Sequence, residues 1–443
     1  MIEEKISSKL IKRFDWLLFG VSILLSLLGI LFIYSATLPS GKAGYFCLKQ
    51  FSAFGLGILS MFALVFFPYT LFREQRYLLY FFPLGLLLGV LFFGTTVRGA
   101  RSWYNLGFFY FQPVELAKIF YILLLAGYLD REEKKLAGVR YLFLPSLFTL
   151  TYVGLTLLQP DFSSSLVFFP LLLGMLYFAG VDLLPLSNLL FYFFLTLGLI
   201  LIDCYFFLVK GGSKILYFFG QVFHQSLPGI IFLLSIFVLL ALIYWFLFKL
   251  KFSIPKRYFL IFYGLILASF FSARVFSSVL KPYQRQRLLA FLNPEIDPLG
   301  AGYNVLQSRI AIGSGKFFGK GLFSGTQAKL GFLPERHTDF IFSLLSEELG
   351  FFGSFFVLGL YFLLIYHALV IAHDARDRFG SLVASGIATM FAFQCMVNIG
   401  MVMGILPATG IPLPFLSYGG SHLVGAFFAL GLLHSIHLRR FVH

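Results

Sequence analysis

Long apolar runs, separated by short polar or charged breaks, organise the chain. Most runs approach the roughly 20 residues that a helix needs to cross a hydrocarbon core, and none alternates in the manner of a barrel strand. We therefore predict an all-α polytopic membrane protein. The twelve predicted transmembrane helices lie near residues 16–36, 50–69, 78–95, 113–129, 141–158, 165–180, 186–209, 229–248, 258–280, 340–372, 383–403 and 421–437.

The composition agrees with this fold class. The 443 residues are 59% hydrophobic and only 12% charged, whereas soluble domains are about 25% charged. The net charge of +15 does not indicate a nucleic-acid partner, because a chain that lies mostly in lipid has little surface for one. Basic residues instead mark alternate breaks between the spans, among them Arg73, Arg131, Lys251, Arg376 and Arg440. By the positive-inside rule, both termini are predicted to lie in the cytoplasm.

One predicted outer connection, the large loop 281–338, is basic as well. It carries Arg285 and Arg287 together with glycines such as Gly315 and Gly319. This composition favours an anionic ligand, because cations and exposed backbone amides can both approach phosphate. A solvated basic loop is the simpler alternative and stays open.

Glu115 and Lys118 form the best candidate pair inside the membrane. They lie three residues apart on one helix face, just after Pro113, which suits the first position of a helix. An ionisable group in a span costs at least a few kcal/mol and usually faces a cavity or a partner. We interpret the pair as lining a polar site, with Lys118 meeting diphosphate or orienting an acid. A purely structural ion pair is an equally good interpretation.

Further candidates precede and follow this pair in the sequence. Arg101 and Trp103 occupy a short outer loop just before it, where a tryptophan is either an interface anchor or a surface on which a sugar ring stacks. Asp161 stands at the start of a later span beside Ser164, and we interpret it as a helix cap.

The densest group of polar residues lies where the basic loop re-enters the membrane, and it includes Arg336, His337, Thr338 and Asp339. Thr338 or Asp339 could cap the following helix, which is the interpretation that local sequence favours. The functional alternative makes Asp339 a general base between a cationic loop and apolar spans.

Residues 406–421 form a Pro- and Gly-broken outer segment that contains Ser417. Irregular backbone at membrane depth must be buried in protein or line a cavity. We predict that this segment completes the wall of a pocket.

Six segments together resemble the SEDS (shape, elongation, division and sporulation) family over most of the chain. They read QPVELAK at 112–118, LQPD at 158–161, YQRQR at 283–287, DPLGAGY at 297–303, PERHTDFIF at 334–342 and TGIPLPFLSYGGS at 409–421. Arg336 after Glu335, with the Pro-rich stretch 411–414, resembles the elongation branch of the family more than its division branch.

The resemblance implies a peptidoglycan glycosyltransferase that polymerises lipid II outside the bacterial inner membrane and releases undecaprenyl diphosphate. Asp339 then corresponds to the catalytic aspartate. The substrate-binding candidates are Glu115, Lys118, Trp103, Arg101, Arg285, Arg287, Arg336, His337 and Ser417. The implied partners are lipid II, a class B penicillin-binding protein and membrane lipids.

The family usually has ten spans, so two of the twelve are interpreted as an extra hairpin near residues 205–260 in a single membrane domain, 1–443. No cofactor and no metal ligands are predicted, and participation of a divalent cation is left open. Two other functions would suit buried charges in a membrane: a flippase or transporter for lipid II, and a non-catalytic scaffold for a wall synthase.

Overall fold

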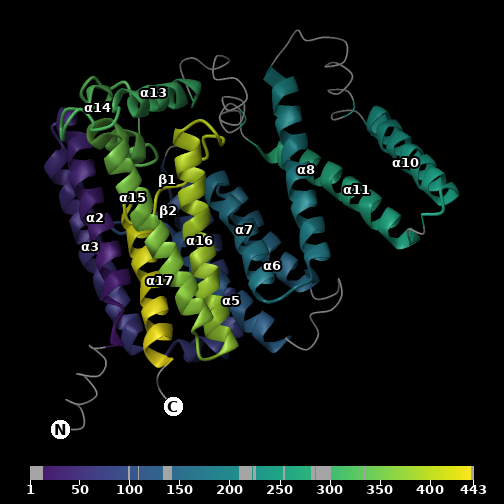
Figure 1. Ribbon diagram of the computed structural model, residues 1–443, viewed down its shortest axis with the longest axis horizontal. Coiled ribbons are helices and arrows are strands. Elements are labelled where there is room, and N and C mark those ends of the chain that lie inside the picture. The colour runs from purple at the N-terminus through teal and green to yellow at the C-terminus, as the bar shows by residue number, and fades with distance from the viewer. Residues whose placement is uncertain are drawn as a thin grey trace. The chain divides into compact units, whose positions relative to one another are not determined.

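The computed structural model describes residues 13–97, 100–107, 109–132, 142–208, 222, 226–252, 255–280, 285, 301–333 and 335–440, and it is dominated by helices (Figure 1). A long helix lies at each of the twelve predicted positions. These helices are α2 (Trp16–Thr37), α3 (Ala43–Phe66), α4 (Arg76–Phe93), α5 (Pro113–Arg131), α6 (Phe143–Leu158), α7 (Phe162–Phe178), α8 (Leu183–Leu208), α10 (Ser226–Lys249), α11 (Lys256–Val279), α15 (Ile341–His373), α16 (Arg378–Val402) and α17 (Gly420–Arg439).

Nine of these described helices are long and apolar enough by themselves to cross a membrane. Helices α6 and α7 are apolar but have only 16 and 17 residues. Helix α5 is long enough with 19 residues, but it carries four charged side chains, at Glu115, Lys118, Asp130 and Arg131. The all-α membrane fold is therefore confirmed, and these three helices depend on their neighbours for burial.

The chain divides into two compact units. Unit 1 consists of Met1–Val181 and Asp297–His443, and unit 2 consists of Asp182–Ile296. In unit 2, α8 packs on α11, where the hydroxyls of Tyr192 and Ser272 lie 2.7 Å apart. The single domain and the extra hairpin near 205–260 stay predictions, and much of the segment 209–225 lies outside the described residues.

Helices α5, α16 and α17 form the interior of unit 1. In the apolar stretch of α17, 83% of the residues are buried, against 33% in α3. Close packing of α3 on α17 depends on glycine, because a Cβ at Gly431 would lie 2.7 Å from the carbonyl oxygen of Met61. Small residues let membrane helices approach in this way without a hydrophobic driving force between them.

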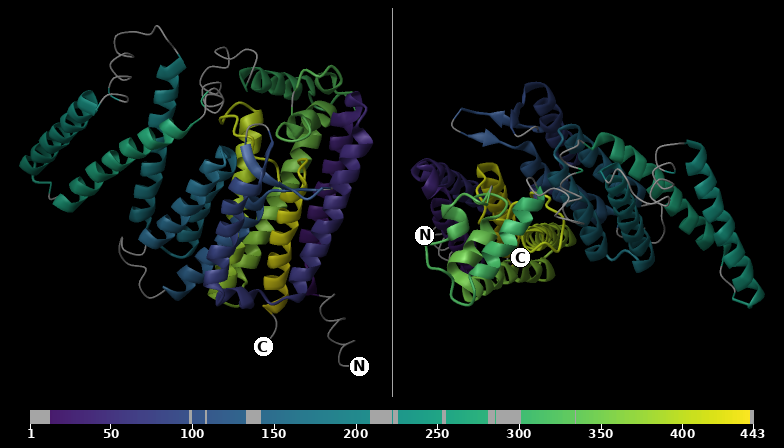
Figure 2. Two further views of the ribbon diagram at one scale, coloured as in Figure 1. Left: turned by 180° about the vertical axis from the view of Figure 1, so that it is seen from behind. Right: turned by 90° about the horizontal axis from the view of Figure 1, so that it is seen from above.

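The two ends of unit 1 differ in composition. We call the end with the first turn of α2 and the last turn of α17 the terminal end (Figures 1 and 2). There, Arg439 Nη2 donates to the carbonyl of Phe66 at 3.0 Å, Arg378 Nη2 donates to the carbonyl of Ala179 at 2.7 Å, and an ion pair joins Arg73 to Asp130 at 2.7 Å. The opposite end carries Asp339 and the candidate site.

The short loop predicted to carry Arg101 and Trp103 contains β-structure instead. Strands β1 (Thr95–Val97), β2 (Ala100–Asn105) and β3 (Tyr110–Phe111) form a three-stranded antiparallel sheet in the order β1-β2-β3. Thr95 pairs with Trp103, and Tyr104 pairs with Phe111. The apolar period of the spans gives no indication of so short a sheet, which is why the sequence analysis missed it.

Part of the large loop 281–338 is helical and packs on α15. It contains α13 (Ala301–Ser314) and α14 (Thr326–Lys329), and between them lies a strap, residues 315–321. Helix α15 is kinked at Gly350, whose φ of 68° and ψ of −161° are not helical. The strap supplies hydrogen bonds at the kink, because Lys320 N donates to Glu347 O and Phe351 N donates to Lys316 O, at 3.0 and 2.8 Å.

The phosphate interpretation of the loop glycines is therefore wrong for Gly315 and Gly319. A Cβ at Gly315 would lie 2.0 Å from the carbonyl oxygen of Ser346, and one at Gly319 would lie 2.1 Å from that of Glu348. These glycines permit close contact between two backbones. The amides of Lys320 and Gly321 already donate to carbonyls of α15.

Gly315→Ala is expected to destabilise the protein by about 1–3 kcal/mol, because the methyl group must displace backbone rather than a flexible side chain. Gly313→Ala is the matched control, since nothing lies within 4 Å of a Cβ there and alanine favours the α13 helix. Thermal unfolding of both purified variants in one detergent measures the difference. Equal midpoints would contradict the tight packing of the strap.

Candidate functional site

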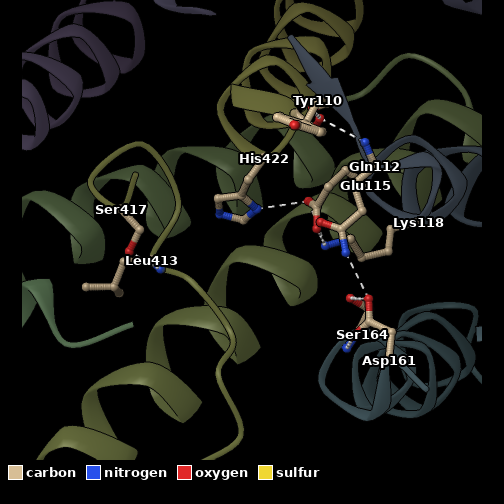
Figure 3. Close-up of polar contacts among 10 residues, drawn as sticks. Tyr110, Gln112, Glu115, Lys118, Asp161, Ser164, Leu413, Ser417 and His422 are labelled. Atoms are coloured by element: carbon tan, nitrogen blue, oxygen red, sulfur yellow. Dashed lines mark hydrogen bonds and ion pairs between the residues drawn. The ribbon is translucent and has the colours of Figure 1, made fainter. Parts of the chain in front are cut away.

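A buried polar cluster of Glu115, Lys118 and His422 lies at the junction of α5 and α17 (Figure 3). Pro113 occupies the first turn of α5, and Glu115 follows in the same turn, where the helix dipole favours a carboxylate. Lys118 Nζ lies 2.8 Å from both carboxylate oxygens of Glu115. The exposed fractions are 7% for Glu115 and 2% for Lys118, so the predicted pair is formed and desolvated.

His422 is the member of this cluster that the sequence analysis missed. Its Nδ1 lies 2.9 Å from Oε2 of Glu115, although the two residues are 307 positions apart. Its Nε2, on the side of the ring away from Glu115, is buried and has no hydrogen-bond partner among the described residues. The sequence does carry a signal for this residue, because His422 is an ionisable residue in a predicted span and such residues usually face a cavity or a partner.

Further hydrogen bonds connect the cluster to α7 and to the sheet. Asp161 caps α7 as predicted, accepting from Ser164 N at 3.1 Å, but it also accepts from Gln112 Nε2 at 2.8 Å. Ser421 Oγ donates to the carbonyl of Tyr110 at 2.8 Å and accepts from Gln112 N at 2.9 Å. Two adjacent residues of α17, Ser421 and His422, therefore fix the start of α5.

Asp339 lies half-buried before α15 and does not cap it. The N-cap residue of α15 is Phe340, and the hydroxyl of Thr338 donates to the carbonyl of Glu335 at 3.2 Å. The interpretation of Thr338 or Asp339 as the helix cap is therefore wrong. The sequence placed the helix start within two residues, but capping depends on geometry that those two residues do not fix.

The backbone around Asp339 is held from two directions. Asn398 Nδ2, in α16, donates to the carbonyl of Asp339 at 2.9 Å and to that of Ile411 at 2.7 Å. Ser417 Oγ donates to the carbonyl of Thr338 at 2.7 Å, and Tyr418 N donates to the carbonyl of His337 at 2.9 Å. Ser417 thus acts on the main chain beside Asp339.

Residues 409–422, which we call the junction segment, contact both parts of the site. Its residues Ser417 and Tyr418 bind the 337–338 backbone, and its residues Ser421 and His422 bind the start of α5. Side-chain atoms of Asn398 (Oδ1), Thr409 (Oγ1) and His422 (Nε2) are buried without a described partner. Buried polar atoms normally have one, so these three atoms are suited to bind water or a ligand.

The remaining candidates lie in other surroundings. Arg101 donates to the carbonyls of Gly94 and Phe92 at 2.8 and 2.7 Å, which satisfies the C-terminal end of α4. Trp103 is half-buried on β2. Arg336 Nε donates to the carbonyl of Ala36 at 2.6 Å, and burial lowers the pKa of Arg336. His337 packs its ring near Phe46 and Tyr418.

The structure describes only one of the two loop arginines that were predicted to contact diphosphate. Arg285 belongs to unit 2, where its Nη2 donates to the carbonyl of Ser277, and Arg287 lies outside the described residues. Lys320, another cation of the loop, pairs with the buried Glu347 at 2.7 Å. Within the described ranges, no group of three or more His, Cys, Asp or Glu side chains could hold a metal ion.

Fold and site together define a polytopic helical membrane protein with a polar site built from buried charges and non-helical backbone at one end of its bundle. Comparison with known proteins identifies the family. A model of the FtsW, RodA and SpoVE cell cycle proteins matches residues 15–219 and 233–441, so the chain belongs to this family, the SEDS family.

Proteins named as peptidoglycan glycosyltransferases are similar in sequence to nearly the whole chain. The peptidoglycan glycosyltransferase RodA of Treponema pallidum is 39% identical, with 97% of this chain and 99% of that protein covered. The peptidoglycan glycosyltransferase MrdB of Escherichia coli K12 is 34% identical, with 95% and 93% covered. A probable peptidoglycan glycosyltransferase FtsW of Trichlorobacter lovleyi is 32% identical, with 96% and 93% covered.

Solved structures agree. A chain from a peptidoglycan synthase complex is 30% identical with a TM-score of 0.62, covering 97% of this chain and 99% of that chain. RodA of Thermus thermophilus is 27% identical with a TM-score of 0.59, covering 97% and 98%. The predicted family is confirmed, and the identities to the RodA and MrdB relatives agree with the elongation branch.

Glu115 and Lys118 are expected to be strongly coupled in a double-mutant cycle of Glu115→Gln and Lys118→Met. Each single change removes one partner of a buried ion pair, which costs about 3–5 kcal/mol, whereas the double variant removes both charges. Unfolding of the four proteins in mixed micelles should give a coupling energy of about 2 kcal/mol or more.

The control cycle uses Asp374→Asn and Arg440→Gln, an ion pair in which the Asp374 side chain is 39% exposed. Exposed pairs couple by about 0–1 kcal/mol. If the buried pair couples no more strongly than this control, the cluster is not the desolvated unit described above.

Proposed function

We propose that this peptidoglycan glycosyltransferase polymerises lipid II at the end of unit 1 that carries Asp339, with Asp339 as the general base. The family match and the glycosyltransferase names of its relatives support the activity. The observation that carries the role of Asp339 is that Phe340, and not this aspartate, occupies the N-cap of α15. Its carboxylate is therefore not required to start the helix.

In the proposed reaction, the carboxylate of Asp339 accepts the proton of an acceptor sugar hydroxyl. The hydroxyl oxygen forms a bond to the anomeric carbon of the donor sugar, and the bond from that carbon to diphosphate breaks. Undecaprenyl diphosphate leaves with the bonding electrons. A general base contributes about 100-fold to 10,000-fold, and diphosphate is already a good leaving group, so no acid partner is needed of the kind that glycoside hydrolases use.

The polar cluster would bind and orient the substrate rather than supply a free cation, because Lys118 is already paired with Glu115. Nε2 of His422, Oδ1 of Asn398 and Oγ1 of Thr409 are buried without a described hydrogen-bond partner. These atoms support the proposal that a polar ligand binds beside the junction segment. Trp103, Arg336, His337 and Ser417 remain proposed contributors. Arg285 and Arg287 remain the proposed contacts to diphosphate, and Arg101 is a weaker candidate because carbonyls of α4 already bind it.

We further propose that the protein works in the bacterial inner membrane during cell-wall elongation, with both termini in the cytoplasm and with a class B penicillin-binding protein as partner. The basic residues gathered at the terminal end support this orientation. The related chain from a peptidoglycan synthase complex supports an assembly of this kind.

Asp339→Asn is expected to lower polymerisation at least 100-fold while insertion, folding and partner binding persist, because the amide keeps the shape of the side chain but cannot accept the proton. The assay measures glycan chains made from lipid II by purified protein with its penicillin-binding partner, whose transpeptidase is inactivated. Asp374→Asn, a carboxylate removed at the terminal end, is the control and should retain activity.

Full activity in folded Asp339→Asn protein would reject the role of this residue and leave the activity itself intact. Two outcomes with the parent protein would reject the activity. Movement of labelled lipid II across a bilayer without polymerisation would indicate a flippase. Partner binding with neither process would indicate a scaffold.

The proposed orientation predicts the reactivity of introduced cysteines. In a variant with Cys47 replaced by serine, a cysteine at Lys251 should not react with an impermeant thiol reagent in intact cells. A cysteine at Phe318, which is 83% exposed in the strap, should react. Reaction at position 251 would contradict the cytoplasmic assignment of the break between α10 and α11.

A further inference from the structure

A cavity of about 290 Å³ opens at the terminal end of unit 1, between α4, α5 and α6. Its rim includes the three arginines Arg73, Arg76 and Arg131, and its walls include Leu123, Leu144 and Phe148. We call it the arginine pocket. Its volume lies at the lower limit of the range for small-molecule sites, about 300–1000 Å³. None of the residues of the proposed active site lines it.

The three arginines are not equivalent. Arg73 makes an ion pair with the buried Asp130 at 2.7 Å, and the carbonyl of Arg73 accepts from Arg131 Nη2 at 3.1 Å. Arg76 Nη2 donates to the hydroxyl of Tyr77 at 3.2 Å. Within the described ranges, neither Arg76 nor Arg131 makes an ion pair with a carboxylate. The positive charges of these two exposed guanidinium groups are therefore only partly compensated. Glu132 is the carboxylate among the residues that line the pocket.

The apolar wall distinguishes this pocket from a site for a free anion. Leu144 is 37% exposed on the wall, and Phe148 packs against Tyr80 and Tyr128. Helices α4 and α6 begin here and α5 ends here, so the pocket lies where helix ends meet the level of lipid headgroups. An amphipathic molecule can place a phosphate on the arginines and an acyl chain against the leucines.

We propose that the arginine pocket binds one anionic glycerophospholipid, with its phosphate between Arg76 and Arg131 and the start of an acyl chain along Leu144 and Phe148. Basic pockets between membrane helices are suited to such headgroups. Arginine suits phosphate better than lysine does, because its planar group donates two hydrogen bonds in parallel. This lipid is distinct from the lipid II of the proposed reaction, and the site does not depend on that function.

The test uses full-length protein, purified and delipidated in detergent, and native mass spectrometry to count bound lipid. The probes are dioleoylphosphatidylglycerol, dioleoylphosphatidylcholine and inorganic phosphate. The parent protein should bind the phosphatidylglycerol in preference to the phosphatidylcholine. The double variant Arg76→Gln with Arg131→Gln should bind phosphatidylglycerol roughly 30-fold more weakly, since each arginine near a lipid phosphate contributes about fivefold.

Unit 2 offers a matched control in Lys256→Gln with Arg257→Gln. Arg257 stands in the first turn of α11 as Arg76 does in α4, donates to the hydroxyl of Tyr258 at 3.2 Å, and lies 5.0 Å from that ring, against 4.8 Å for Arg76 and Tyr77. This variant removes two exposed positive charges and should bind like the parent.

Gly127→Leu gives a second variant that fills the pocket without a change of charge. A Cβ at Gly127 meets only ordinary contacts, 3.6 Å from Arg73 O and 3.8 Å from Phe379, so its side chain can enter the cavity. This variant should also lose the bound phosphatidylglycerol. Three results would overturn the proposal: equal binding of the two lipids, no effect of the arginine variant beyond that of its control, or displacement of the lipid by millimolar inorganic phosphate.

Discussion

Non-helical backbone close to a bilayer must find its hydrogen-bond partners inside the protein, because hydrocarbon offers none. The junction segment meets this constraint with side chains from α3 and α16 and with one of its own. Gln50 donates to the carbonyl of Ser417 and accepts from the amide of Gly419, Asn398 donates to the carbonyl of Ile411, and Ser417 accepts from the amide of Leu413. Helices α3, α16 and α17 are thereby fixed relative to one another around a stretch that has no regular structure of its own.

Buried charges lie in the same part of unit 1, directly beside the junction segment. The junction segment leads directly into α17, and its last residue, His422, reaches the carboxylate of Glu115. An isolated carboxylate in such a position would be costly, but Glu115 is surrounded by Lys118 and His422 and stands at the favourable end of a helix dipole. The packing of the helices, the hydrogen bonds of the junction-segment backbone and the compensation of the Glu115 charge therefore depend on one another.

The sequence predicted what depends on local properties. Span positions follow from run length and apolarity, the Glu115–Lys118 pair follows from helical spacing, and the Asp161 cap follows from the residue type beside Ser164. What it missed depends on residues far apart in the chain. The His422–Glu115 contact joins positions separated by 307 residues, and the glycines of the strap have their reason in the backbone of α15, about thirty residues later. A single sequence contains no record of such proximity, so the glycines suggested a ligand where they serve a backbone contact.

The hydrogen bonds described around Asp339 involve main-chain carbonyls and not its carboxylate. The hydrogen bonds described above that hold residues 337–339 end on their main-chain carbonyls, which every residue type provides. The helix that follows takes Phe340 as its N-cap and is held at Gly350 by the strap, with Glu347 anchoring Lys320 and the start of α14. The hydrogen bonds to residues 337–339 therefore do not depend on the type of side chain at position 339. Glu347 and Glu348 differ, because their buried carboxylates accept hydrogen bonds from Lys320 of the strap and from the amides of Phe323 and Thr326, which follow it. The buried carboxylates of Glu347 and Glu348 thus anchor the segment that follows α13, whereas the carboxylate of Asp339, eight or nine residues earlier, is the one that we propose for the chemistry.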